Sequence, residues 1–383
     1  NLDFSPERVS LTGLNMKIGQ SDFRLTGNVR NYLNYIFKEG TLNGDFQLNS
    51  NFLNINELLR IQKEIPEDNK SAEVTGTPEQ QPQPAGTDSI LVFDVPRNVD
   101  FTFRSEIQRA LFDQVQINDI RGLITAKDGK LLLNGLDMKM LDGEFRLTGS
   151  YENTPRNQPL VDLGFDVINF DIPMAFQSFT GFGKMMPVAG HSQGRFSTSI
   201  KFNGSLSESL KVIPASVDGA GSFATAGLVI MNSPLFSRLK GILREDLLKN
   251  ISVDDFNANF QVDDGNLLLK PFKTMISGQE TQISGSLSAQ NILDMRMDFK
   301  IPKDAFGPDI RNILSAIPGN RNITLVPAGV VIKGPVGNPE VKMDLDEAKK
   351  LIANTTKDEL KNSLNKLGSG LKKLLDNNPP PKE

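Results

Sequence analysis

Apolar and polar residues alternate along much of the chain with a period of two. In one segment Leu136, Met138 and Met140 alternate with Asp137 and Lys139. Successive side chains of a β-strand point to opposite faces of a sheet, so this pattern predicts strands with one apolar and one polar face. The chain is therefore expected to be mainly β and mostly antiparallel. The same alternation recurs at Phe101 and Phe103, at Leu163, Phe165 and Val167, at Phe196, Thr198, Ile200 and Phe202, and at Leu293, Met295, Met297, Phe299 and Ile301.

An internal repeat organises these strands. The segment 13–27 returns at 135–149, with nine of fifteen positions identical and no gap. A fainter third copy contains Asp264-Gly265 and ends at Gly285. Repetition of this kind is typical of proteins built from stacked structural units. The sequence therefore predicts a repeat-built sheet.

Each repeat predicts an antiparallel meander. The pair Asp128-Gly129 favours a tight turn with positive φ angles. We expect it to be followed by a short strand, a second strand of alternating residues, a turn, and a third strand that ends at Gly149.

A few short helices are expected between the strands. In the segment 233–250, apolar residues recur at helical spacing, and Pro308 suits the first position of a helix. The predicted helices span residues 52–63, 171–182, 233–250 and 308–317.

Four regions follow from these patterns. Residues 1–65 form a β-repeat segment that opens in mid-pattern and is expected to continue an upstream region. Residues 66–88 contain four prolines and only one strongly apolar residue, Val74, which predicts a disordered insertion. Residues 89–345 form the main β region, and residues 346–383 form an amphipathic helix and tail.

The C-terminal helix leaves two hypotheses open. Its leucine stripe could dock on the end of the sheet and cap an open edge. Alternatively, it could lie on a membrane surface and use its lysines. Residues 346–383 carry eight lysines against six acidic residues, a net charge of +2 that is modest for attraction to a membrane, so docking is favoured.

Composition limits the classes of function that this chain can have. The net charge is −4, which provides no basic field for nucleic acid. The chain has no cysteine and a single histidine, His191, which excludes thiolate chemistry and disulfides and argues against histidine triads and clustered metal sites. We expect neither a cofactor nor a metal, and no enzymatic activity. The sequence contains no run of 18 apolar residues, so it predicts no membrane-spanning helix.

Three motifs resemble functional signatures but are predicted to be ordinary turns or helix ends. Residues 190–194 match the G-x-S-x-G pattern of hydrolases, but the only histidine lies inside the motif and a strand pattern follows it, so we predict a turn. Residues 181–184 lack the spacing of a phosphate-binding loop. The pairs Asp254-Asp255 and Asp263-Asp264 lack calcium-loop spacing and are assigned to turns.

The apolar strand faces admit two hypotheses, a conventional sandwich core or a surface that binds lipid. Methionine fits either, because it packs irregular cores and also lines adaptable binding surfaces. The residues predicted to line such a lipid groove are Phe101, Phe103, Leu136, Met138, Met140, Phe145, Leu147, Phe165, Val167, Phe196, Ile200, Phe202, Leu293, Met295, Met297 and Phe299.

The order of these motifs resembles the C-terminal region of AsmA-family proteins of Gram-negative bacteria. The resemblance is carried by 128–149, by 219–223 with the helix from Ser233, by 256–285, and by 323–339, where an apolar strand is followed by Gly, a short turn and Asn338-Pro339. It covers most of residues 1–345. The chain differs from the family pattern by lacking a membrane anchor within these residues and by carrying the insertion 66–88.

The resemblance implies a periplasmic protein tethered to the inner membrane by an upstream anchor, with a role in outer-membrane biogenesis. It also implies a relationship to bridge-type lipid-transfer proteins, in which a curved sheet forms an elongated groove for acyl chains. The expected partners are phospholipid or another acyl lipid, with outer-membrane assembly proteins as further partners. The alternative is a non-enzymatic scaffold that assists outer-membrane protein assembly, with its apolar faces closed into a core.

Overall fold

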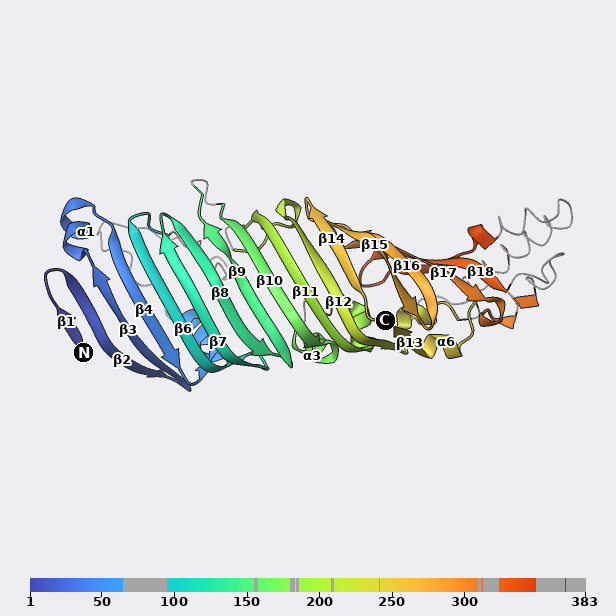
Figure 1. Cartoon of the computed structure of the whole chain (residues 1–383), viewed down its shortest axis with the longest axis horizontal. Coiled ribbons are helices and arrows are strands. Elements are labelled where there is room, and N and C mark those ends of the chain that lie inside the picture. Colours follow the sequence, from blue (N-terminus) through green and yellow to red (C-terminus); the bar gives the residue numbers. More distant parts are fainter. Residues whose placement is uncertain are drawn as a thin grey trace, which may run out of the picture. The chain divides into compact units, whose positions relative to one another are not determined.

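The computed structural model describes residues 1–64, 95–154, 158–179, 183, 186–207, 210–240, 242–308, 311–312, 324–348 and 369. Strands dominate this part of the chain (Figure 1). Strands β6 to β19 make up more than half of residues 89–345, which confirms the prediction of a mainly β fold. The nineteen strands of the described residues belong to one mixed, mostly antiparallel sheet.

The strands are β1 Leu2–Phe4, β2 Arg8–Ile18, β3 Ser21–Arg30, β4 Leu42–Ser50, β5 Leu53–Asn54, β6 Val99–Phe112, β7 Val115–Lys127, β8 Lys130–Met140, β9 Gly143–Glu152, β10 Leu160–Asp171, β11 Ser192–Ser205, β12 Asp218–Met231, β13 Asn250–Val253, β14 Asn257–Asp263, β15 Asn266–Ile276, β16 Gln279–Leu287, β17 Ile292–Pro302, β18 Leu325–Pro335 and β19 Glu340–Asp344. The described helices are α1 Tyr32–Lys38, α2 Ile55–Glu64, α3 Ile172–Ser178, α5 Pro234–Ser237 and α6 Asp246–Lys249, with 3-10 turns η1 Pro187–His191, η2 Pro214–Ser216 and η3 Lys303–Ala305.

The chain divides into two compact units. Unit 1 comprises Asn1–Met140, Glu144–Phe165 and Asn203–Ser216. Unit 2 comprises Leu141–Gly143, Asp166–Phe202 and Val217–Glu383.

In unit 1 most neighbouring strands pair antiparallel, but β4 and β5 both pair parallel with β6. The pairs β1–β2, β2–β3, β3–β4, β6–β7 and β7–β8 are all antiparallel. Strands β4 and β6 run parallel, with Gly44 opposite Phe101. Parallel neighbours need a crossover connection, and the connection here contains α2, which begins within the predicted helix 52–63.

The predicted Asp-Gly turns are confirmed. The φ angles are 52° and 82° at Asp128-Gly129, and 47° and 75° at Asp264-Gly265. Two positive φ angles define the type I′ turn, whose twist matches that of the strands it joins. Each turn therefore closes a tight hairpin, β7–β8 in one repeat and β14–β15 in the other.

The prediction of two separate strands after each Asp-Gly turn is wrong. Strand β8 is continuous, but its register with β7 shifts between Leu133, opposite Ile124, and Leu136, opposite Gly122. An extra residue on one strand forms a β-bulge, which keeps Leu133 and Leu136 on the same face. Strand β9 also continues past Gly149 to Glu152.

The other two repeats have a bulge at the matching place. In β2 the register shifts between Leu11 and Leu14, and in β15 it shifts between Leu269 and Phe272. The third repeat has Pro271 within its bulge, and a bulge is one of the few sites in a sheet that accept a residue without an N–H group.

The glycine that closes each repeat lies against a bulky side chain of the next strand. A Cβ atom at Gly27, Gly149 or Gly285 would come within 3.0 Å of Phe46, Leu163 or Met295, respectively. Real Cβ atoms essentially never come this close to other atoms, so each position requires glycine for a steric reason.

The helices confirm two predictions and correct a third. Helices α2 and α3 lie within the predicted segments 52–63 and 171–182, apart from one residue at the end of α2. The segment 233–250 contains two four-residue helices, α5 and α6, instead of one long helix.

The break between α5 and α6 has a long-range cause. The backbone N–H of Arg244 donates to the carbonyl of Ala305 (2.9 Å), and the N–H of Gly307 donates to the carbonyl of Ile242 (2.8 Å). These bonds engage backbone groups that a continuous helix would have used.

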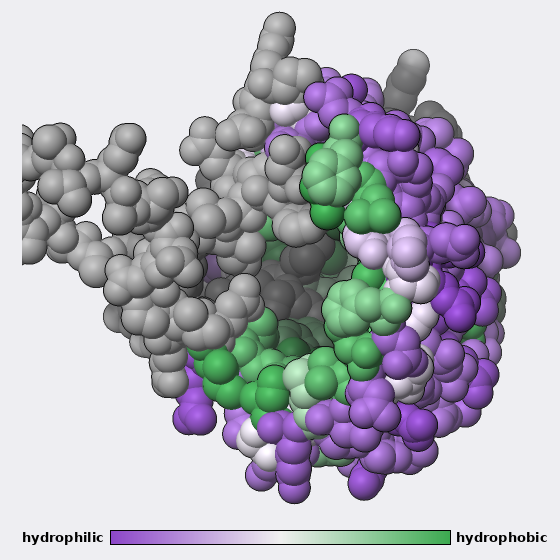
Figure 2. All heavy atoms as spheres, turned by 90° about the vertical axis from the view of Figure 1, so that its left-hand side faces the viewer, coloured by the Kyte–Doolittle hydropathy of each residue, from purple (hydrophilic) through white to green (hydrophobic). Residues whose placement is uncertain are grey.

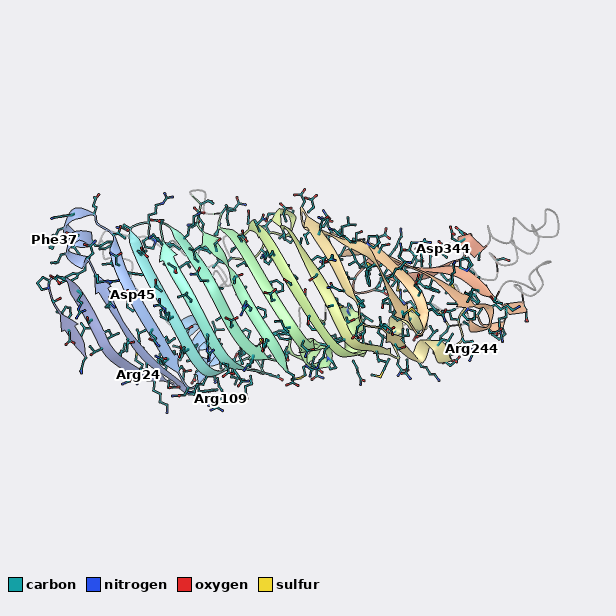
Figure 3. The ribbon with its side chains drawn as sticks, in the orientation of Figure 1. Arg24, Phe37, Asp45, Arg109, Arg244 and Asp344 are labelled. Carbon is teal, nitrogen blue, oxygen red and sulfur yellow. The ribbon has the colours of Figure 1, made fainter. Side chains whose placement is uncertain are left out.

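Helix α1 was not expected. It joins β3 to β4, and none of its residues is buried. Phe37 is 76% exposed and stands near one end of unit 1 (Figure 3).

Three predictions fall on residues outside the described part of the chain. They are the insertion 66–88, most of the helix 308–317, and the helix and tail within 346–383.

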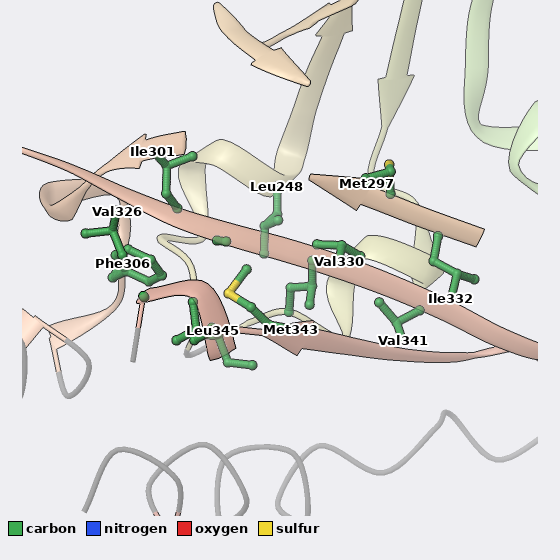
Figure 4. Packing of buried hydrophobic residues seen from close by; sticks show 14 residues of the cluster. Leu248, Met297, Ile301, Phe306, Val326, Val330, Ile332, Val341, Met343 and Leu345 are labelled. Atoms are coloured by element: carbon green, nitrogen blue, oxygen red, sulfur yellow. The ribbon is translucent and has the colours of Figure 1, made fainter. Parts of the chain in front are cut away.

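Unit 2 contains a closed hydrophobic core. Phe306 and Ile242 are 0% exposed, and they pack with residues of β17, β18 and β19 (Figure 4). Leu248 of α6 and Met343 of β19 belong to the same cluster as Val330 of β18. The segment 234–248 therefore covers the apolar face of these strands.

The steric role of the closing glycine can be tested in the first repeat. We expect Gly27→Ala to lower the free energy of unfolding by about 1–3 kcal/mol, because the new methyl group overlaps Phe46. Gly13→Ala is the matched control. A Cβ there meets nothing within 4 Å, so its effect should stay within about 0.5 kcal/mol. Urea unfolding measures both, and equal effects would contradict the steric explanation.

Candidate functional site: two apolar faces

Unit 1 carries an apolar face made of alternate strand positions. Pairing places Phe101 opposite Ala126, Phe103 opposite Ile124, and Leu136 opposite Gly122, so these side chains share one side of the sheet. The predicted lipid-groove residues in unit 1 are all half-buried: Phe101, Phe103, Leu136, Met138, Met140, Phe145, Leu147 and Phe165. The rings of Phe145 and Phe165 stack with centroids 6.3 Å apart.

The prediction missed residues that extend this face. Leu14, Met16 and Ile18 of β2 are 38%, 40% and 36% exposed. They occupy the repeat positions of Leu136, Met138 and Met140, so the offset between the repeats was a signal that could have identified them. Register carries the face onward through Phe23 and Leu25 of β3.

The opposite face of unit 1 is polar and bears cross-strand ion pairs. Arg30 pairs with Asp45 (2.7 Å), and Lys139 pairs with Asp119 (2.9 Å). The hydrogen bond from Lys139 lowers the pKa of the Asp119 carboxyl below its usual value. Exposed pairs of this kind contribute little stability, but they mark a surface adapted to water.

Figure 2 shows the two faces from the N-terminal end of unit 1. Hydrophobic residues line a hollow, and hydrophilic residues cover the outside. The apolar face is therefore the concave one, which gives it the shape of a groove.

In unit 2 the predicted residues lie in more buried surroundings. Val167 and Phe196 are each 7% exposed, whereas Ile200 and Phe202 are half-buried. Phe196 belongs to a row of aromatic rings with successive centroids 6.0, 5.7, 6.3 and 4.8 Å apart. The row consists of Phe170, Phe196, Phe223, Phe256 and Phe272.

The four candidates on β17 contact the closed core. Met297 is 9% exposed and is a member of the core cluster. Leu293, Met295 and Phe299 are partly buried and pack against it. The predicted residues on β17 therefore lie against a core, whereas those of unit 1 lie on a half-buried face.

A partly open space lies on the covered face of unit 2. A cavity of about 450 Å³ lies between the segment 234–248 and strands β12, β13 and β15 to β18. Its lining is mainly apolar and includes Phe236, Leu247, Ile283 and Met297. This volume falls in the range of roughly 300–1,000 Å³ that is typical of small-molecule sites.

The hydrolase-like motif forms a turn, as predicted. Residues up to His191 belong to η1, and β11 begins at Ser192, so the chain runs from a helical turn into a strand. The hydroxyl of Ser192 donates to the carbonyl of Val188 (2.8 Å) and is buried. Within the described ranges, no group of three or more His, Asp or Glu residues is arranged to hold a metal ion.

Comparisons with known proteins give no match: no family model, no curated protein and no solved structure is similar to this chain. Among the described residues, no helix is both long and apolar enough to cross a bilayer.

The difference in burial between the two faces can be measured by replacing one methionine on each face with alanine. Met297→Ala should lower the free energy of unfolding by about 2–4 kcal/mol, because it removes buried apolar contacts and enlarges the cavity that Met297 lines. Met138→Ala, on the half-buried face, should cost no more than about 1 kcal/mol. Denaturant unfolding followed by circular dichroism gives both values. A large loss at Met138 would mean that its face is closed as well.

Proposed function

We propose that this protein is an AsmA-like periplasmic lipid-binding protein that acts in outer-membrane biogenesis and holds acyl chains on its apolar β-faces. The observation that carries the proposal is the concave apolar face of unit 1, whose side chains are only half-buried. Large exposed apolar surfaces are uncommon on soluble proteins and mark binding sites. An acyl chain has the apolar surface that this face requires.

The energetics favour such a ligand. Transfer of a sixteen-carbon chain into water costs on the order of 12 kcal/mol, at about 0.8 kcal/mol for each CH₂ group. A surface that shields half of the chain lowers the barrier to leaving a membrane by several powers of ten. Binding and transfer of this kind require no catalytic residue, and we propose a non-enzymatic role.

The cellular setting of the proposal comes from the family resemblance. It comprises the periplasm, a tether to the inner membrane upstream of these residues, a phospholipid or other acyl lipid as ligand, and outer-membrane assembly proteins as further partners. The polar outer face, with its paired charges, leaves the concave face as the part suited to an apolar ligand.

A second candidate function has one observation in its favour. The core of unit 2 buries Met297, Ile301 and Val330 against other side chains of the same unit. A scaffold that assists outer-membrane protein assembly would need only such self-contained packing.

The two functions differ in their response to a charge on the open face. Met138→Arg should fold, because a half-buried arginine can extend its guanidinium to water, but it should lose bound phospholipid. Native mass spectrometry of the purified protein measures the bound lipid, and thermal unfolding measures the fold.

Leu132→Arg is the matched control on the same strand. Leu132 is 38% exposed and is paired with Thr125 on the polar face, so its variant should retain lipid. A parent protein without phospholipid, or equal lipid in both variants, would reject the lipid-binding proposal and favour the scaffold.

A further inference from the structure

The cavity of unit 2 has a charged border. Most of its lining is apolar, and Arg244 and Asp304 are its charged residues. A second, polar depression of about 500 Å³ shares Leu243 and Arg244 with it. Arg244 therefore stands where an apolar space meets a polar one, next to α6 (Figure 3).

The guanidinium of Arg244 is held in place and keeps donors available. Its Nε and Nη2 atoms donate to Asp246, over 3.0 and 2.7 Å. Its Nη1 atom donates to no residue in the described part of the chain. The hydrogen bond that Arg244 donates to Asp246 raises the pKa of Arg244, so the guanidinium stays charged. A fixed guanidinium with spare donors suits an oxyanion.

The polar depression has an excess of positive charge. Its basic side chains are Lys240, Arg244 and Arg311, and its acidic ones are Glu245 and Asp246. Both acids already have cationic partners, since Lys240 pairs with Glu245 (3.2 Å) and Arg244 with Asp246. The remaining positive charge of the depression is that of Arg311, and it favours an anionic group on the side of Arg244 away from Asp304, which lines the cavity.

We propose that the unit 2 cavity binds one acyl chain of a single glycerophospholipid, and that Arg244 holds the phosphodiester of this lipid at the border of the cavity. This inference rests on the lipid-binding function proposed above and assigns a lipid class and a headgroup contact to unit 2. The polar depression favours a phospholipid over a fatty acid, because it offers polar and basic side chains to a headgroup larger than a carboxylate.

The chain contains no tryptophan, so a single tryptophan can report from each face. Phe236→Trp places the reporter in the cavity lining, and Phe101→Trp places one on the open face of unit 1. The probe is a lysophospholipid with a brominated acyl chain, because bromine quenches the fluorescence of a tryptophan that it contacts. We expect saturable quenching of the cavity reporter. If Phe236→Trp does not fold, Phe299→Trp reports from the same cavity.

The headgroup contact is tested on the cavity reporter. Arg244→Ala should weaken binding of the lysophospholipid by about ten-fold or more, since hydrogen bonds to charged groups contribute roughly 1.5–3 kcal/mol. Arg244→Lys should recover part of this loss. A brominated monoacylglycerol, which has the same chain but no phosphate, should bind equally to the parent and to Arg244→Ala. Arg24→Ala, which removes an exposed arginine of unit 1, is the control and should change nothing.

The outcomes separate the two proposals. Quenching at Phe101→Trp but not in the cavity overturns the inference and leaves the proposed function standing. Quenching at neither position overturns both. Cavity binding that is unaffected by Arg244→Ala overturns the headgroup assignment, as does a brominated fatty acid that binds as tightly as the lysophospholipid and depends equally on Arg244.

Discussion

The apolar side of each strand must be kept out of water, and the two units meet this requirement differently. In unit 2 the segment 234–248 folds back over β17 and β18 and buries their inner residues in a core. In unit 1 the corresponding side chains stay half-buried along a concave surface. The same alternation of residues therefore produces a buried core beside a cavity in one unit and a half-buried concave apolar surface in the other.

This constraint explains why every repeat contains a bulge. In β8 the inward residues are odd-numbered up to Leu133 and even-numbered from Leu136. Without the extra residue, Met138 and Met140 would turn to the polar face, because a slip of one residue inverts a strand. The bulges of β2 and β15 make the same correction. The bulge is thus what keeps the apolar face continuous along a long strand.

The alternation, the Asp-Gly turns and helices α2 and α3 could be predicted because they depend on neighbouring residues. The prediction from sequence divided each bulged strand in two. A break in the period-two alternation looks the same in sequence whether a strand ends or forms a bulge. The prediction of one helix over 233–250 was wrong because the backbone groups of Ala305 and Gly307, far along the chain, form hydrogen bonds with the backbone of this segment. Most candidate residues could be placed on an apolar face, but whether that face is covered depends on such distant segments. The cavity and the position of Arg244 could not be predicted for the same reason.

The parallel pairing of β4 with β6 bears on how unit 1 assembles. The hairpins β2–β3 and β6–β7 join residues that are close in the chain, so little entropy is lost in closing them. The contact between Gly44 and Phe101 closes a far longer loop through α2. Folding rates fall as contacts become less local. This topology therefore favours a folding order in which two meanders form independently and then pair along β4 and β6.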